Sequence, residues 1–250
     1  MIAAPVTGEA LIAAFDLPPG PAPRRIAKAT VADNVPTTAD KRLVDGKLAR
    51  LDWIASINPA TTGIAACDTV QTLNLLLART RGPLPPRLAE IVHRAIPQPV
   101  ILIHADEAAD ASAGLSLAPK RMAEREAGRV VLTAMHDTGP LSEADRPFVA
   151  TLTLARLPAR DLAALYAGLI ERSEALAAAR AGTRTFRLAG STEELERWRL
   201  ALADGTILTA EIATLGAAMR KESRLGRRVE LGEKIRILKA SLDICQAGLE

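Results

Sequence analysis

Apolar and polar positions change period several times near the N-terminus. Residues 17–23 hold four prolines, which fix φ and remove backbone donors, so this segment predicts an extended arm. Residues 25–31 alternate loosely, which predicts a short strand or an extended segment. Thr38 offers an N-cap to a helix over about residues 39–50, interrupted by Gly46. That helix is expected to turn three leucines inward: Leu43, Leu48 and Leu51.

The segments that follow predict a sheet. A strand runs from Leu51 until Asn58-Pro59 breaks it, and a second begins near Thr69 with one face far more apolar than the other. Helical spacing over 86–96 comes next, and then an apolar run of strand length that suits burial on both faces. The apolar run is 100–103. Three further strand candidates are 114–119, 128–135 and 148–154. The fold class is therefore α+β, with a mixed sheet of five or six strands and flanking helices.

Beyond residue 157 the pattern becomes helical. A wide apolar stripe predicts a helix over about 158–180, with Pro158 in its first turn. Ser191-Thr192-Glu193-Glu194 forms a capping-box pattern that opens another helix, which Asp204-Gly205 is expected to close.

The last forty residues carry two coiled-coil seams. Their members are Leu208, Ile212, Leu215, Met219, then Leu231, Ile235, Leu238, Leu242 and Cys245. Gly226 lies near the break between them, which predicts an antiparallel αα-hairpin with arms of about 25 Å. Two interpretations stay open: the hairpin projects and binds a partner, or the two helices lie packed on the sheet domain.

Three regions are expected on these patterns. Residues 1–24 form an N-terminal arm, residues 25–157 a mixed α+β domain, and residues 158–250 a helical region that ends in the coiled-coil hairpin.

Composition narrows the class without naming a function. The chain is 48% hydrophobic and 24% charged, as globular proteins are. No uncharged apolar run reaches membrane-spanning length, and the first residues lack the features of a secretory signal, so we expect a cytoplasmic protein away from membranes. Cys67 and Cys245 are too few for a disulfide framework or a zinc site.

Motifs for catalysis and cofactor binding are missing. His93, His104 and His136 have no spacing that would place two on one metal ion. No phosphate-binding glycine loop and no serine nucleophile motif occurs. We therefore expect no cofactor, no metal and no catalytic residue, and we favour a protein that is not an enzyme.

One enzyme class remains an alternative. A helix, two strands, a helix and a buried strand follow each other in restriction-like nucleases, which need an acidic residue plus an acid-x-Lys on the next strand to hold Mg²⁺ and activate water. Asp68 is expected to begin that strand, but residues 71–75 supply neither carboxylate nor lysine. A degenerate or divergent metal-dependent nuclease is the alternative that this order leaves open.

A basic cluster marks the predicted hairpin tip. The net charge is +3 and aromatic residues are 2%, so bulk charge and base stacking predict no nucleic-acid partner. The tip holds Arg220, Lys221, Arg224, Arg227 and Arg228. The cluster is either solvated or contacts phosphate or a protein partner.

Several segments together resemble a bacterial family, domain of unknown function 4391. They are residues 15–18 (FDLP), residues 53–64 (WIASINPATTGI), residues 95–102 (AIPQPVIL), residues 215–222 (LGAAMRKE) and residues 229–231 (VEL). The resemblance covers about residues 15–245 and departs in the strand after Asp68. It implies an accessory subunit encoded beside a helicase or DNA methyltransferase of a restriction-like or anti-phage system, and it supplies no catalytic residues.

Overall fold

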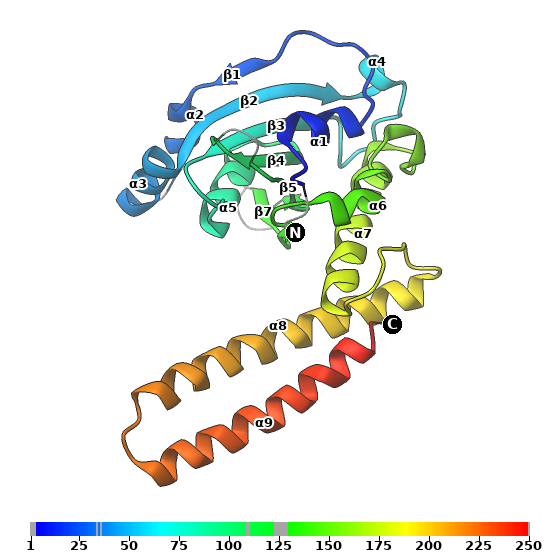
Figure 1. The fold of residues 1–250 in the computed structure, drawn as a ribbon. Helices are drawn as coiled ribbons and strands as arrows, with labels where there is room; N and C mark the ends of the chain where they lie inside the picture. The colour runs from blue at the N-terminus through cyan, green and yellow to red at the C-terminus, as the bar shows by residue number, and fades with distance from the viewer. Residues whose placement is uncertain (1–3, 34, 36, 109–110, 123–129, 250) are drawn as a thin grey trace. The chain divides into compact units, whose positions relative to one another are not determined.

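A computed structural model describes residues 4–33, 35, 37–108, 111–122 and 130–249 (Figure 1). The chain divides into two compact units, Met1–Ser173 and Glu174–Glu250, and each is described by itself.

The first unit is built on a mixed sheet (Figure 1). Within the described residues its six strands run in the order β1-β2-β3-β4-β5-β8. They are β1 Arg24–Ile26, β2 Leu48–Ile57, β3 Leu73–Thr80, β4 Val100–Asp106, β5 Ala113–Leu117 and β8 His136–Asp137. β3 and β4 are parallel and the other neighbours are antiparallel. A separate pair joins β6 Lys120–Met122 to β7 Val130–Leu132. The predicted α+β class and mixed sheet are confirmed.

Helices surround this sheet. They are α1 Gly8–Ala14, α2 Lys28–Ala32, α3 Thr38–Lys47, α4 Pro59–Thr62, α5 Pro86–Ala95, α6 Arg146–Val149 and α7 Leu162–Ala181. Two 3₁₀ turns span Glu143–Asp145 and Leu154–Arg156. α5 makes the crossover that a parallel β3–β4 pair requires.

The core of the first unit lies on both faces of β3 and β4. On one face Leu76 and Leu102 join a cluster with Val44 of α3 and Leu88 of α5. On the other face α1 packs closely, since a Cβ added at Gly8 would lie 3.3 Å from Leu77 Cδ1. Burial on both faces explains why these strands read as continuous apolar runs.

Two polar side chains of the first unit join separate segments. The Tyr166 hydroxyl of α7 donates to Val100 O at 2.9 Å and accepts from Ala118 N at 2.8 Å. The Arg172 guanidinium donates to three carbonyl oxygens, those of Thr151, Arg156 and Gly168. These contacts join α7 to the segments around β4, β5 and residues 151–156.

Several expected boundaries in the first half are wrong. β1 ends at Ile26 and α2 follows, so 25–31 is not one strand. The third helix is capped by Thr37 rather than Thr38, and it ends at Lys47 because β2 already begins at Leu48. β3 starts at Leu73, four residues after the expected Thr69.

Expected elements beyond β5 also need correction. Residues 148–154 form no strand, because Pro147 opens α6 and a 3₁₀ turn follows. α7 starts at Leu162 rather than Pro158, where Asp161 Oδ1 accepts from Ala164 N at 2.7 Å. The strand expected over 128–135 is present as β7, and its first two residues lie outside the described residues.

The second unit contains the predicted hairpin, α8 Thr192–Lys221 against α9 Leu225–Ala247 (Figure 1). Ser191 caps α8 as expected, accepting from Glu194 N at 3.2 Å. Asp204-Gly205 does not end a helix, since α8 continues through it for 30 residues in all. Leu242 of α9 packs beside Gly205, since a Cβ at Gly205 would lie in ordinary contact, 3.5 Å from Leu242 Cδ1. The 23 residues of α9 give an arm of about 35 Å, longer than expected.

The turn between the arms is also displaced from the expected position. It spans residues 222–224, and Gly226 belongs to the first turn of α9. All nine predicted seam residues are buried or half-buried, whereas most of their neighbours are exposed. At the base of the hairpin, Trp198 is fully buried, with the Arg184 guanidinium 4.2 Å from its ring. Within the described residues, α8 is a helix that could span a membrane by length and composition.

We expect Gly114→Ala to destabilise the first unit. The new Cβ would overlap the carbonyl oxygen of Gly139 and lie 2.5 Å from His104 Cε1, so backbone must move at a cost of about 1–3 kcal/mol. Gly46→Ala in α3 is the matched control, because nothing lies within 4 Å of its Cβ position and alanine favours the helix by about 0.5–1 kcal/mol. Urea unfolding of the two variants measures both effects. Equal stability of the two would contradict the packing described here.

Candidate functional site

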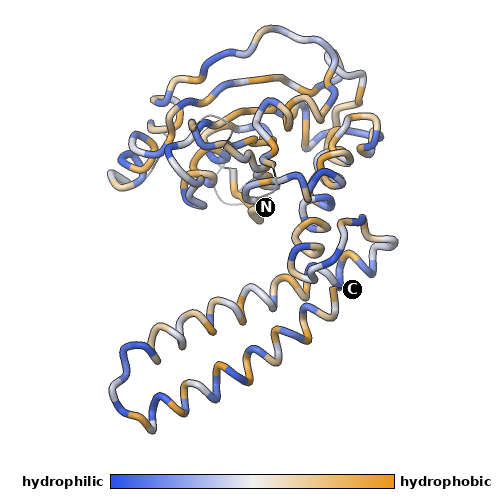
Figure 2. The backbone as a smooth tube through the Cα atoms, in the orientation of Figure 1, coloured by the Kyte–Doolittle hydropathy of each residue, from blue (hydrophilic) through white to orange (hydrophobic). Residues whose placement is uncertain are grey.

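The five basic residues of the predicted tip come together at the hairpin turn. Arg220 and Lys221 end α8, Arg224 caps α9, and Arg227 and Arg228 lie in its first turn. All five side chains are exposed. Figure 2 shows a hydrophilic segment at this turn, with apolar positions recurring along both arms. The structure therefore brings every residue of this candidate site into one short loop region.

The charges at the tip are only partly compensated within the chain. Arg227 forms an ion pair with Glu230 at 2.5 Å. The other four cations make no ion pair with any described residue. Four exposed positive charges remain available to an anionic partner.

The helix dipoles also affect how favourable each basic residue is at its position. Arg220 and Lys221 lie at the negative end of α8, where cations are favourable. Arg227 and Arg228 lie at the positive end of α9, whose first turn holds no acidic residue. Each such cation is unfavourable by about 0.3–1 kcal/mol. Helix stability therefore does not account for these two arginines.

Asp68 is not placed where the nuclease hypothesis needs it. It lies in a turn closed by a bridge between Cys67 and Val70, before β3 begins. It lines a cavity of about 640 Å³ with Lys120 and Tyr166. Burial lowers the pKa of Lys120 to about 7, and its ammonium group donates to the carbonyls of Ile96 and Gln98, each at 2.6 Å. Among the described residues that line this cavity, Asp68 is the only carboxylate, whereas Mg²⁺ binding of this type needs two.

A charged cluster that the sequence patterns did not reveal lies on β2 and β3. Asp52 of β2 is directly opposite Leu77 of β3, and Arg50 is opposite Arg79. Since alternate residues share a face, these side chains lie together on the face that α1 covers. Glu9 of α1 pairs with Arg79 there, and Asp52 accepts from Arg50 at 2.6 Å. Hydrogen bonding to its own backbone amide, then to Arg79, lowers the pKa of Glu9.

This cluster stands where an acid and an acid-x-Lys would be required on neighbouring strands. Asp52 supplies the first acid, but Leu77-Ala78-Arg79 stands in place of the second motif. Leu77 is buried, and both Glu9 and Asp52 are neutralised by arginine. No group of three potential metal ligands occurs among the described residues.

Two histidines are core residues rather than metal ligands. His93 is fully buried, and its Nε2 lies 3.1 Å from Ser116 Oγ. Burial, then the charge of Lys120, lowers the pKa of His93 to about 3, so it is neutral at neutral pH. His104 Nε2 lies 3.2 Å from Asp137 Oδ1. His136 lies on β8 and is opposite Leu117 of β5.

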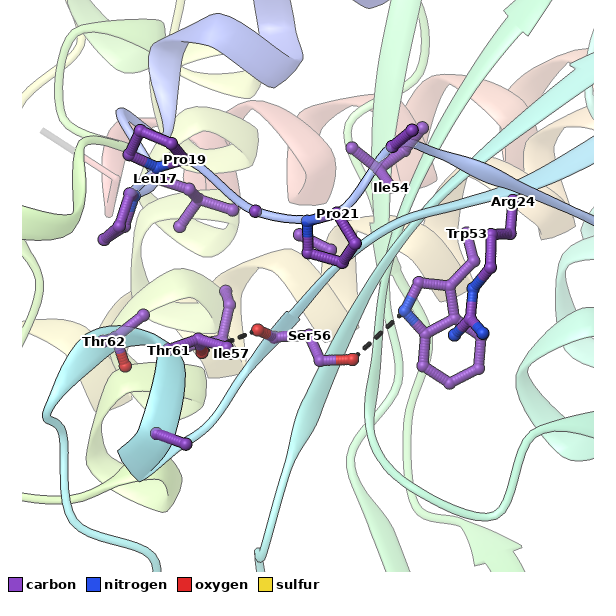
Figure 3. A pocket seen from close by; sticks show the side chains of 15 residues that line it. Leu17, Pro19, Pro21, Arg24, Trp53, Ile54, Ser56, Ile57, Thr61 and Thr62 are labelled. Atoms are coloured by element: carbon purple, nitrogen blue, oxygen red, sulfur yellow. Dashed lines mark hydrogen bonds between the residues drawn. The ribbon is translucent and has the colours of Figure 1, made fainter.

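A groove separates the proline-rich arm from the edge of β2 (Figure 3). β1 pairs with β2 only as far as Trp53, and the arm covers the edge beyond it. Trp53 Nε1 donates to Ser56 Oγ at 3.2 Å, and the Arg24 guanidinium lies 5.9 Å from the Trp53 ring. The cavity is about 260 Å³. As predicted, residues 17–23 form neither helix nor strand, and their prolines cannot donate to an added strand.

Comparison with known proteins gives one match. The model of the family described as Domain of unknown function (DUF4391) matches residues 15–242. The chain has no match among curated proteins and none among solved structures.

We expect no Mg²⁺-dependent cleavage of plasmid or single-stranded DNA by this protein. The physical reason is that Asp52 and Glu9 are held by arginines and the second metal-binding acid is a buried leucine. Titration of Mg²⁺ with both substrates measures this, and Asp68→Ala serves as a control away from the cluster. Cleavage that Asp52→Ala abolishes and Asp68→Ala leaves intact would contradict the expectation.

Proposed function

Because the chain belongs to the DUF4391 family over nearly its whole length, we propose that it is a non-enzymatic accessory subunit of a bacterial restriction-like or anti-phage defence complex. Its partner in this proposal is a helicase or DNA methyltransferase of the same cytoplasmic system. The observation that carries the proposal is the hairpin, whose exposed basic tip opposes the dipole of α9. The arginine-paired cluster on β2 and β3 supports a role without catalysis.

The hairpin also offers a surface for a protein partner. A groove of about 440 Å³ runs along it, lined mainly by small residues and by Leu202, Leu242 and Leu249. The small residues include Ala201, Gly205, Thr206, Thr209, Ala210 and Ala213. Small side chains allow the backbone of an added helix to approach closely, as in helix-in-groove recognition. We assign this groove to the protein partner and the tip to phosphate.

We expect the native partner to co-purify with this protein through the groove. Ala213→Arg places a long charged side chain in the groove and should abolish retention of the helicase or methyltransferase encoded with it. Ala203→Arg is the matched control, since Ala203 is exposed on the same helix and is not among the groove residues. Affinity capture from the native operon followed by mass spectrometry measures retention. A protein that elutes alone at physiological salt would count against the proposal.

Binding of DNA through the tip should depend strongly on salt. Each neutralised duplex phosphate contributes about −0.9 to the slope of log K against log salt. Arg224→Ala with Arg228→Ala removes two cations that have no ion pair, so the slope should shrink by up to about 1.8. Arg236→Ala with Lys239→Ala is the control, with two cations of α9 away from the tip.

Stability separates the outcomes of this experiment. Loss of either exposed side chain should change the free energy of unfolding by no more than about 1 kcal/mol, and loss of Arg228 from the positive end of α9 should raise it slightly. A folded tip variant that keeps the parental salt slope would show that the tip is only solvated. Loss of folding would show that these arginines are structural.

The strand arrangement and two carboxylates of the first unit support the nuclease alternative. The antiparallel β2–β3 pair and the parallel β3–β4 crossover are the strand arrangement that it requires, and Glu9 and Asp52 are two carboxylates on one face. In this alternative the chain is a degenerate or divergent member of that class. The cleavage assay described above decides between the two.

A further inference from the structure

Lys120, the first residue of β6, is a half-buried lysine without a carboxylate partner. Its Nζ donates to Ile96 O and to Gln98 O, each at 2.6 Å, and it forms no ion pair with any residue that the structure describes. Ile96 is the C-cap of α5, so the helix dipole and the two carbonyl oxygens favour an ammonium group. Burial has the opposite effect and outweighs them, because it lowers the pKa of Lys120 to about 7.

The charged and titratable groups around Lys120 do not compensate for its burial. Burial, then the positive charge of Lys120, lowers the pKa of His93 of α5, so His93 is neutral at neutral pH. Arg121 lines the same cavity as Lys120 and is a second cation. Asp68 also lines it but forms no ion pair with Lys120, and the Tyr166 hydroxyl is held by two backbone groups. About half of the protein therefore carries Lys120 as a neutral amine at pH 7.

Lys120 is part of the wall of the cavity of about 640 Å³. Three prolines, Val70 and Ile170 make most of this wall apolar. The volume lies within the roughly 300–1,000 Å³ of small-ligand sites, which are mainly apolar and hold a few polar groups at fixed positions. The cavity thus combines room for a small molecule with one amine in its wall.

The hydrogen bonds of Lys120 leave one position of the neutral amine open. A neutral amine has two N–H groups and one lone pair, and the carbonyls of Ile96 and Gln98 accept from both N–H groups. The lone pair is left without a use in the fold. A desolvated lysine in this state is the kind that forms a Schiff base with a carbonyl compound. We propose that Lys120 binds a small, mainly apolar aldehyde or ketone in this cavity by forming an imine with it.

The reaction needs no further reactant. The lone pair of Nζ attacks the carbonyl carbon, the C=O π electrons move to oxygen, and a proton passes from nitrogen to oxygen to give a carbinolamine. The nitrogen lone pair then forms the C=N bond as the hydroxyl group leaves with the second N–H proton as water. The products are one imine and one water, with no net oxidation or reduction. A protonated imine keeps one N–H for the carbonyl of the buried Ile96, while Gln98 is exposed and its carbonyl can bind water.

The imine site is separate from the proposed partner and phosphate sites. Every described residue that lines the cavity belongs to the first unit, whereas the groove and the tip belong to the hairpin. The proposal therefore stands or fails independently of the accessory role.

Trapping of the imine tests the amine. The full chain is incubated at pH 7 with pyridoxal, an aromatic aldehyde, and borohydride then reduces each imine to a stable amine that peptide mass spectrometry locates. Lys120 should be labelled at least about tenfold faster than Lys47, because an ordinary lysine with a pKa of about 10.4 is almost wholly protonated. Lys47 is the matched control, since it is exposed, donates to Arg81 O at 3.4 Å and does not line the cavity. Equal labelling of the two lysines would overturn the proposal.

Filling the cavity tests where the aldehyde binds. Ala167 is exposed on α7 and lines the cavity, so Ala167→Trp should slow pyridoxal labelling of Lys120 roughly fivefold or more. Labelling by formaldehyde, which is much smaller, should change less than about twofold. Ala177→Trp is the control, because Ala177 is exposed on the same helix and does not line the cavity. Pyridoxal labelling that Ala167→Trp leaves intact would show that Lys120 reacts at the surface, and the cavity site would be wrong.

The pH dependence of stability separates a neutral amine from a structural cation. The pKa of Lys120 in the folded protein lies below its value of about 10.4 in the unfolded chain, so the unfolded chain binds more protons and stability rises with pH between the two values. From about pH 7 to about pH 9 the unfolding constant of the parent should fall at least tenfold more than that of Lys120→Met. Urea unfolding at a series of pH values measures this. Parallel profiles would show that Lys120 stays charged as a cap of α5, and they would overturn the proposal.

Discussion

Burial of β3 and β4 on both faces is the constraint on which the first unit depends. α3 and α5 cover one face and α1 the other, so the residues of these strands must be mainly apolar. The same requirement limits chemistry, because a side chain such as Leu77 that completes the core cannot also be a metal-binding carboxylate. The charged residues Arg50, Asp52 and Arg79 are confined to the end of the face where α1 supplies Glu9. Burial of β3 on both faces therefore explains both its apolar packing and why Leu77-Ala78-Arg79 stands where an acid-x-Lys would be needed.

Local patterns predicted those parts of the fold in which one period persists. The run from Val100, the helix with His93 and the two seams were found because each repeats a single spacing over several residues. Boundaries failed where a tertiary contact overrides a local signal. Gly205 does not end α8, because α9 packs against it and stabilises the helix on both sides. Pro147 favoured a helix in a segment whose alternation suggested a strand.

Only one of the two candidate sites could be recognised before the fold was known. The tip is local, since its five basic residues lie within nine positions of the sequence. The cluster on β2 and β3 joins Glu9 to Arg79 across 70 positions, and the pairing depends on the register between two strands and on the place of α1. Asp68 was a reasonable candidate only while β3 was expected to begin near it. A one-residue difference in register changes the face on which each side chain lies, so such a cluster requires the structure.

A two-helix hairpin cannot bury more than one seam by itself, and this limit determines what its remaining surface can do. α8 and α9 bury their shared seam, and the rest of the hairpin surface is open to other molecules. One side carries a groove lined by small residues, which suits an added helix. The tip lies beyond this groove, so phosphate binding at the tip is compatible with a helix in the groove. One supersecondary unit can thus present a partner site and carry a basic end.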